Sequence, residues 1–443
     1  MNPEPLQIPM LLGRISIAVI ALSHSLCATF IVGAALIGAV IMTIAYVTRR
    51  RDYARLAHMI AFILVLTTGT ISFLGVAFVF ALNILWPRFW HTLFQTMFWP
   101  FLSEAVLFLG EAVCAYAWYY LWLWSEKDDW RRKMHLAFAW VAAASALAAM
   151  FLIDLTASYM LTPSGRKGVW TNIFNPTMID LDLHRWFGNL TWTGFALASL
   201  CAIGWLRARR STEVSYYAWA ATLCFSIGFG ALLVMPVIGY QYLLHVRYGQ
   251  PQAFETLMLG SRSWLFDVVV WLYSALVLIG SGFMWRRLRS MLPPGSFGHA
   301  FLPVSLFVLS GAAFILIQPY HIQHLPWAST VTTWTFNPLG KMQPYKYYAL
   351  AFLVIFGLAN WLCFIAALAR QAFQAAMTLA HDRRAPSLLL ALGVCAMGIM
   401  LVMGWTRETA RAYNGYLVYG EIKIADETRT YTGPFADQMK PAR

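Results

Sequence analysis

Long apolar runs separated by short polar stretches dominate the chain. Each run is long enough to cross the hydrocarbon core of a bilayer as an α-helix, which takes about 20 residues. The runs lie at roughly 15–47, 56–82, 93–124, 134–161, 183–206, 215–244, 264–285, 298–318, 345–369 and 386–405. This pattern predicts an all-α polytopic membrane protein with about ten transmembrane helices. We expect a short external N-terminal segment at 1–14, a transmembrane domain at 15–412 and an external tail at 413–443.

Composition agrees with a membrane protein. Hydrophobic residues make up 60% of the chain and charged residues 12%, with a mean hydropathy of +0.61, more apolar than a soluble domain tolerates. The net charge is +13, but Lys and Arg sit in short clusters between apolar runs. With no basic arm, RNA-binding motif or phosphate-cradling glycine loop, the chain is predicted to contact lipid and not nucleic acid.

The positive clusters also predict an orientation. They follow the odd-numbered runs, as at Arg49–Arg51 and Arg131–Lys133. By the positive-inside rule these loops are cytoplasmic, which places both termini on the external face. Residues 1–13 lack the basic start and cleavage site of a signal peptide, so we expect them to be retained. We therefore expect a multi-pass protein of a bacterial or archaeal cytoplasmic membrane.

Glu104 and Glu111 lie in one apolar run, seven residues or two helical turns apart, and so share one helix face. An ionised carboxylate in hydrocarbon is expensive and usually meets a partner, a proton or a cofactor inside a bundle. The predicted topology puts most intramembrane polar groups in the external half of the membrane. These are His24, Glu104, Glu111, Asp154, His184, Asp267 and Glu408. A transporter would favour a midplane site at broken, repeated helices, and no such repeat is visible.

Histidine and glutamate among many aromatic residues suit b-type haem, which imidazole or carboxylate can ligate. The six cysteines are single, without CxxC or CxxCH, which disfavours c-type haem, iron–sulfur clusters and thiolate zinc. Each histidine also has a structural interpretation. His24 is equally typical of a hydrogen-bonded core residue, and His184 of an interfacial one. His58, His135 and His381 adjoin the inner charge clusters and are predicted to be interfacial.

Several motifs follow one another in the order of a known family. They are Ser23-His24-Ser25-Leu26, Thr68-Gly69-Thr70, Leu109-Gly110-Glu111-Ala112, Leu183-His184-Arg185 and Gly404-Trp405-Thr406-Arg407-Glu408 with Arg411. In this order they resemble the large haem-bearing subunit, subunit I, of the cytochrome bd quinol oxidases. The resemblance covers most of 15–255 and 345–412. It implies a haem-binding helical bundle.

The resemblance implies roles for these residues. His24 and Glu408 would be axial ligands in the active-site haem pair, and His184 a ligand of the low-spin haem. Trp405 and Arg411 would bind cofactor, with Arg411 pairing a haem carboxylate. Glu111 and Glu104 would act beside the haem pair on the proton route. The implied cofactors are two or more haem b, with haem d open at one position, and quinol is the implied substrate.

The chain also departs from the family pattern. The second ligand of the low-spin haem would be Met342, which does not align cleanly, with His321 or His324 as alternatives. Gln250 and Glu255 resemble part of the quinol-binding segment. However, its usual Lys is absent and two apolar runs, 264–285 and 298–318, replace the long hydrophilic loop. No final membrane helix follows the Glu408 motif.

Three functions remain open at this point. The first is a respiratory quinol oxidase that passes electrons from quinol at the external face through b-type haems to oxygen. The second is a related electron-transfer subunit that exchanges electrons between quinone and an external redox partner without reducing oxygen. The third is a proton-coupled transporter that uses the intramembrane acids. For the first two we expect a second membrane subunit, an external cytochrome c or another redox subunit, with the tail as a docking segment.

Overall fold

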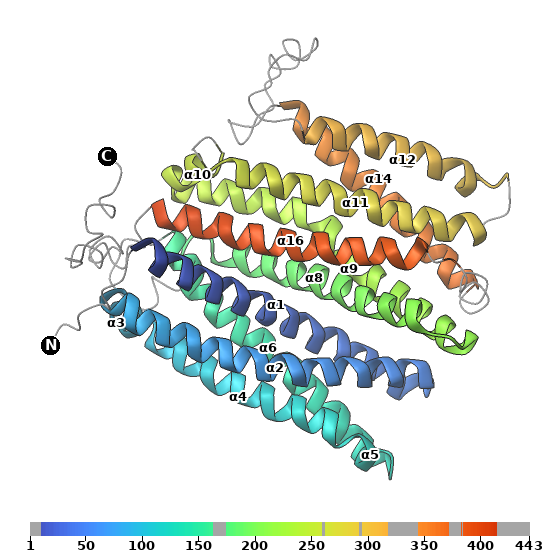
Figure 1. The fold of residues 1–443 in the computed structure, drawn as a ribbon, viewed down its shortest axis with the longest axis horizontal. Coiled ribbons are helices and arrows are strands. Elements are labelled where there is room, and N and C mark those ends of the chain that lie inside the picture. Colours follow the sequence, from blue (N-terminus) through green and yellow to red (C-terminus); the bar gives the residue numbers. More distant parts are fainter. Residues whose placement is uncertain are drawn as a thin grey trace. The chain divides into compact units, whose positions relative to one another are not determined.

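The computed structural model describes residues 10–162, 174–258, 262–291, 295–317, 344–371, 382 and 384–413, and within them the regular structure is helical (Figure 1). Ten of these helices are long and apolar enough to cross a membrane. This confirms the predicted all-α membrane fold. The chain divides into two compact units, one of residues 1–183, 245–256 and 407–443, and one of 184–244 and 257–406.

Four long helices form the first unit: α1 (Met10–Thr48), α2 (Arg51–Leu85), α4 (Phe98–Tyr120) and α6 (Asp129–Leu161). In Figure 1, α1 packs against α2 and α6, and α4 packs against α6 and α2. Trp118 of α4 is fully buried, and a Cβ added at Gly38 of α1 would lie only 2.5 Å from its ring. A glycine is therefore needed for this close approach.

The third apolar run forms three helices, not the single predicted span 93–124. They are α3 (Pro87–Thr96), α4, and α5 (Trp122–Ser125), with breaks at Met97 (φ −113°) and Leu121 (φ −89°). Pro100 explains the first break. It has no N–H to donate to the carbonyl of Thr96, and its ring would clash with that carbonyl in a continuous helix.

The second unit contains most of α8 (Met178–Arg207) and α9 (Ser211–Gly249), then α11 (Trp264–Met291), α12 (Phe297–Leu316), α14 (Pro344–Gln371) and most of α16 (Arg384–Tyr413). The short α10 (Pro251–Met258) lies mainly in the first unit. Glycines bring α8 and α9 together, because a Cβ at Gly194 would lie 2.6 Å from Cα of Gly228. Ser199 Oγ joins α8 to α16 by donating to the carbonyl of Leu389 (2.8 Å).

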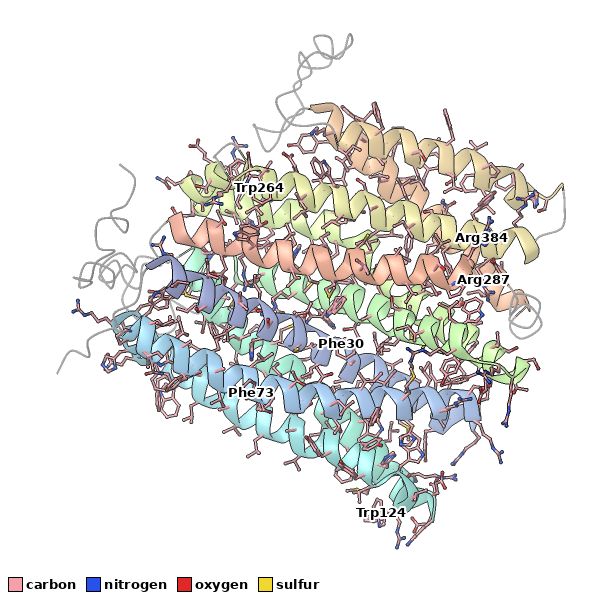
Figure 2. All side chains as sticks on the ribbon, in the orientation of Figure 1. Phe30, Phe73, Trp124, Trp264, Arg287 and Arg384 are labelled. Atoms are coloured by element: carbon pink, nitrogen blue, oxygen red, sulfur yellow. The ribbon has the colours of Figure 1, made fainter. Side chains whose placement is uncertain are left out.

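The second unit carries positive charge at one end. In Figure 2, Trp264 begins α11 at one end of the unit, whereas Arg287 and Arg384 lie at the other. Arg287 is 1% exposed and stands over the Trp205 ring, and the neighbouring Arg286 pairs with Asp382. This is one of the positive clusters that the sequence predicts to be cytoplasmic.

The last helix is longer than its apolar run. We predicted an end near 405, but α16 continues to Tyr413. Residues 406–413 contain neither Gly nor Pro and are rich in good helix formers, so the helix extends beyond the apolar part. Glu408 and Arg411 are therefore helical residues and do not follow the helix. The tail from 414 onward lies outside the described residues.

Candidate haem and quinol sites

His24 lies in the first half of α1 and faces α2. A Cβ added at Gly75 of α2 would be 3.3 Å from Cε1 and 3.7 Å from Nδ1 of His24. Phe78, one turn further along α2, places its ring centroid 6.2 Å from that of His24, at an interplanar angle of 30°. The imidazole thus packs against α2 at a glycine, and an aromatic ring of the same helix lies nearby.

His184 has the same kind of neighbours on another helix pair. It lies in the second turn of α8, where a Cβ added at Gly239 of α9 would be 3.8 Å from Cε1 and 3.9 Å from Nδ1. Tyr242, three residues beyond Gly239, has its ring centroid 5.8 Å from that of His184. Pro236 interrupts the hydrogen-bond ladder of α9 one turn earlier. Each candidate ligand therefore stands beside a glycine followed by an aromatic residue.

Glu111 is a buried carboxylate on α4, 3% exposed. Its Oε1 has no hydrogen-bond partner among the described residues. Glu104 is half-buried on the same helix and close enough to interact with Glu111 electrostatically. On the packed helix α6, Asp154 is fully buried. Because an unsatisfied carboxylate in an apolar bundle is costly, Glu111 needs a proton or a bound group.

These surroundings fit haem. Imidazole nitrogens and carboxylates are ligands of haem iron. At His24 and His184 the imidazole packs beside a glycine of the neighbouring helix, and an aromatic residue lies close to it. The orphaned Oε1 of Glu111 gives the first unit a buried polar atom for a bound cofactor or for protons.

The C-terminal motif is only partly described. Glu408 is half-buried, and its Oε1 lies 3.8 Å from Nη2 of the adjacent Arg407. Trp405 is 44% exposed and packs edge-on against Trp264, with centroids 5.4 Å apart. The backbone of Arg411 is in α16, but its side chain lies outside the described part. The same holds for the whole of Met342, His321 and His324.

The predicted quinol segment is a helical corner. The N–H of Gln250 donates to the carbonyl of Val246 (2.8 Å), and the N–H of Phe254 donates to the carbonyl of Gln250 (3.2 Å). Gln250 thus joins α9 to α10. Phe254 is 1% exposed and anchors α10, whereas Glu255 is exposed. The segment therefore presents polar groups from a fixed backbone.

Sequence reasoning missed a polar pair next to this corner. His245, one turn before Gly249, forms a short contact through Nδ1 with Oδ2 of Asp180, in the first turn of α8. These residues are 65 positions apart. The only local signal was a histidine shortly before Gln250-Pro251 and an acid one turn before His184.

The structure gives a hydrogen-bond partner to His135, one of the histidines predicted to be interfacial. It is fully buried, and its Nε2–H donates to the carbonyl of Trp118 (2.6 Å), in the last turn of α4. Its ring stands edge-on to Trp122, on which His58 stacks with centroids 4.5 Å apart. His135 therefore caps a helix end, and His381 lies outside the described residues.

Comparisons with known proteins identify the family and the fold. A sequence model of the cytochrome bd terminal oxidase subunit I family matches residues 12–434. The structure of bd oxidase from Geobacillus thermodenitrificans superposes with a TM-score of 0.53 and 17% identity, covering 94% of this chain and 99% of that chain. At this identity the likeness shows the fold alone. A search of curated proteins found no match. Because the family model spans nearly the whole chain, the protein belongs to the cytochrome bd terminal oxidase subunit I family.

Proposed function

We propose that this quinol-oxidase family member oxidises quinol at the external face of the cytoplasmic membrane and passes the electrons through b-type haems to oxygen. One observation carries the proposal. On two separate helix pairs, a histidine stands beside a glycine that is followed one turn later by an aromatic residue, at His24 with Gly75 and at His184 with Gly239. Family membership favours this redox function over a proton-coupled transporter.

The ligands follow from this assignment. His184 would hold the low-spin haem, with Met342 as its second ligand. His24 and Glu408 would hold the active-site haem pair, in which one member would be either haem b or haem d. Trp405 would pack near a haem and Arg411 would pair with a haem carboxylate. When bound, these haems supply one-electron transfer and an oxygen site.

The protein's own groups would manage the protons. Glu111 is buried with an orphaned oxygen, and the half-buried Glu104 lies within electrostatic reach of it. Two carboxylates two turns apart on one helix face can exchange a proton through bound water. We assign Glu111 to delivering protons toward the His24 site and Glu104 to supplying Glu111. Gln250 and Glu255 would bind the quinol from the corner between α9 and α10.

A second function is favoured by the architecture after this corner. Helices α11 and α12 follow α10 where the family resemblance leads us to expect a long hydrophilic quinol loop. With two apolar helices in place of that hydrophilic loop, the chain also suits an electron-transfer subunit that exchanges electrons between quinone and an external redox partner. A second membrane subunit, an external cytochrome c or another redox subunit belongs to the same proposal.

The test is a reduced-minus-oxidised visible spectrum of the purified protein, with pyridine haemochrome analysis, repeated after adding carbon monoxide. We expect b-type haem, a carbon-monoxide-sensitive component, and oxygen uptake driven by quinol. His24→Ala should abolish the carbon monoxide response and oxygen uptake, while the exposed His91→Ala control on α3 retains both. Low-spin haem b without a carbon monoxide response would select the electron-transfer function. A colourless protein would overturn both.

A further inference from the structure

A histidine and a carboxylate from different helices meet beside the predicted quinol segment. Nδ1 of His245 on α9 contacts Oδ2 of Asp180 on α8. The Asp180 side chain is 11% exposed, whereas the His245 side chain is 42% exposed. The carboxylate is thus largely inside the protein and the imidazole extends from it toward the surface. Both residues belong to the first unit.

A buried polar network fixes the helix ends that carry this pair. Asn175 Nδ2 donates to Ser158 Oγ (2.9 Å), and the hydroxyls of Thr162 and Thr177 are 2.7 Å apart. All four residues are buried. A Cβ added at Gly249 would lie 3.3 Å from Cγ2 of Thr162, so the end of α9 packs directly on the network. Buried hydrogen bonds and close packing therefore join the helix ends that carry the pair.

The contact defines the chemistry of the imidazole. Because an ionised carboxylate only accepts hydrogen bonds, the Nδ1–H of His245 donates a hydrogen bond to Oδ2 of Asp180. This tautomer leaves Nε2 as the basic nitrogen, on the more exposed side chain of the pair.

The pair lies close in sequence to the proposed quinol residue Gln250 and the proposed haem ligand His184. Along α9, His245 precedes Gln250 by little more than one turn, and the backbone hydrogen bonds continue through Val246 to Gln250. Along α8, Asp180 precedes His184 by four residues, or one turn. Gln250 and His184 would therefore each lie within little more than one helical turn, along the chain, of a member of the pair.

We propose that Nε2 of His245 accepts the quinol protons and that Asp180 is its positioning residue. The inference rests on the proposed quinol oxidation and deepens it. Oxidation of a quinol to a quinone breaks two O–H bonds and releases two electrons. In each half, a hydroxyl O–H bond would break, an N–H bond would form at Nε2 of His245, and one electron would pass to the haem that His184 would hold. The imidazolium then returns its proton to external water before the second half.

The test measures anaerobic reduction of the bound haem by a soluble quinol in stopped flow, with dithionite as a reductant that bypasses quinol. His245→Gln keeps an N–H for Asp180 but has no basic nitrogen. We expect about a 10²-fold slower reduction by quinol, the lower end for loss of a positioned proton acceptor, with an unchanged spectrum and unchanged dithionite reduction. Asp180→Asn should slow the same step while the haem spectrum is retained. The exposed His91→Gln is the matched control.

A second variant separates chemistry from structure. In His245→Ala, added imidazole should restore part of the quinol rate, whereas 1,2,4-triazole, of the same shape but far less basic, should not. Quinol rates within about threefold of wild type in His245→Gln would overturn the inference. So would equal rescue by both azoles, or a loss of haem in His245→Gln, since each indicates a structural ion pair. If quinol fails to reduce the wild-type haem, the proposed function itself fails.

Discussion

The imidazole of His24 on α1 faces Gly75 on α2, where an added Cβ would lie 3.3 Å from Cε1. At that distance even one methyl group is tight, and a branched side chain would displace the ring. Any larger side chain at Gly75 would therefore press on the candidate ligand. The same relationship recurs between His184 and Gly239, with a somewhat wider separation of 3.8 Å.

Gly75→Val should disturb the haem at His24. The branched side chain would displace the imidazole, so we expect a weakened carbon-monoxide-sensitive spectral component and at least about tenfold lower oxygen uptake, about 1.4 kcal/mol. Gly311→Val is the control, because nothing lies within 4 Å of a Cβ at Gly311 on α12. Both variants introduce a β-branched residue into a helix. An identical spectrum in the two variants would argue against a haem beside Gly75.

Glu111→Gln should separate proton delivery from haem binding. Glutamine keeps the size of the side chain but cannot carry a proton to the site, so we expect haem content to persist while oxygen uptake falls roughly 10²-fold. Glu104→Gln, in a less buried position, should lower the rate less. The exposed Glu126→Gln should match wild type. Full activity in Glu111→Gln would exclude the proposed proton role.

Gly194→Ala should destabilise the second unit. A Cβ there would lie 2.6 Å from Cα of Gly228 and 2.9 Å from the carbonyl oxygen of Cys224, both backbone atoms that cannot rotate away. Helices α8 and α9 would have to separate, and we expect a loss of about 1–3 kcal/mol from overpacking. Gly282→Ala has open space and should instead gain about 0.5–1 kcal/mol from helix propensity. In thermal unfolding, the melting temperature should fall below that of wild type for Gly194→Ala and rise above it for Gly282→Ala.

His135→Leu should weaken the end of α4. The buried carbonyl of Trp118 would lose the Nε2–H donor that lies 2.6 Å away, at a cost of about 1–3 kcal/mol. His135→Gln can place an amide N–H near the same carbonyl and should recover part of the stability. Thermal unfolding followed by tryptophan fluorescence measures both. Equal melting temperatures for the Leu and Gln variants would show that the hydrogen bond contributes nothing.

The ion pair of Arg286 with Asp382 should make the stability of the folded state depend on pH in the acid range. Partial burial works to raise the pKa of Asp382, but hydrogen bonds from the Arg286 side chain and the backbone N–H of Arg384 outweigh it. The pKa therefore lies below its ordinary value of 3.8. A carboxyl with a depressed pKa stabilises the folded state above its unfolded pKa and loses that contribution as pH falls through the folded value.

We therefore expect Asp382→Asn to lower the free energy of unfolding by a constant amount from pH 8 to about pH 5. For a partly exposed pair this amount is at most about 1 kcal/mol. The difference from wild type should shrink below about pH 4. The measurement is the melting temperature of both proteins in detergent across this range. A difference that grows on acidification would contradict the sign of the pKa change.

The sequence alone determined the ten apolar helices, the acids on α4 and the collinear motifs of the cytochrome bd subunit I family, since hydropathy, helix periodicity and motif order are local properties. Even the break at Met97 has a local cause in Pro100. The helix-forming residues at 406–413 also favour the extension of α16 past its apolar run, although hydropathy alone does not predict it.

Only the tertiary structure decided which side chains meet. Gly75 stands beside His24, His135 caps the end of α4 at Trp118, and Asp180 reaches His245 across 65 residues of chain. In a bilayer, every one of these helices satisfies its own backbone and is apolar on most faces, so hydropathy does not specify which faces pack together. Close contacts at small residues and buried hydrogen bonds fix the pairing, and these depend on residues distant in sequence.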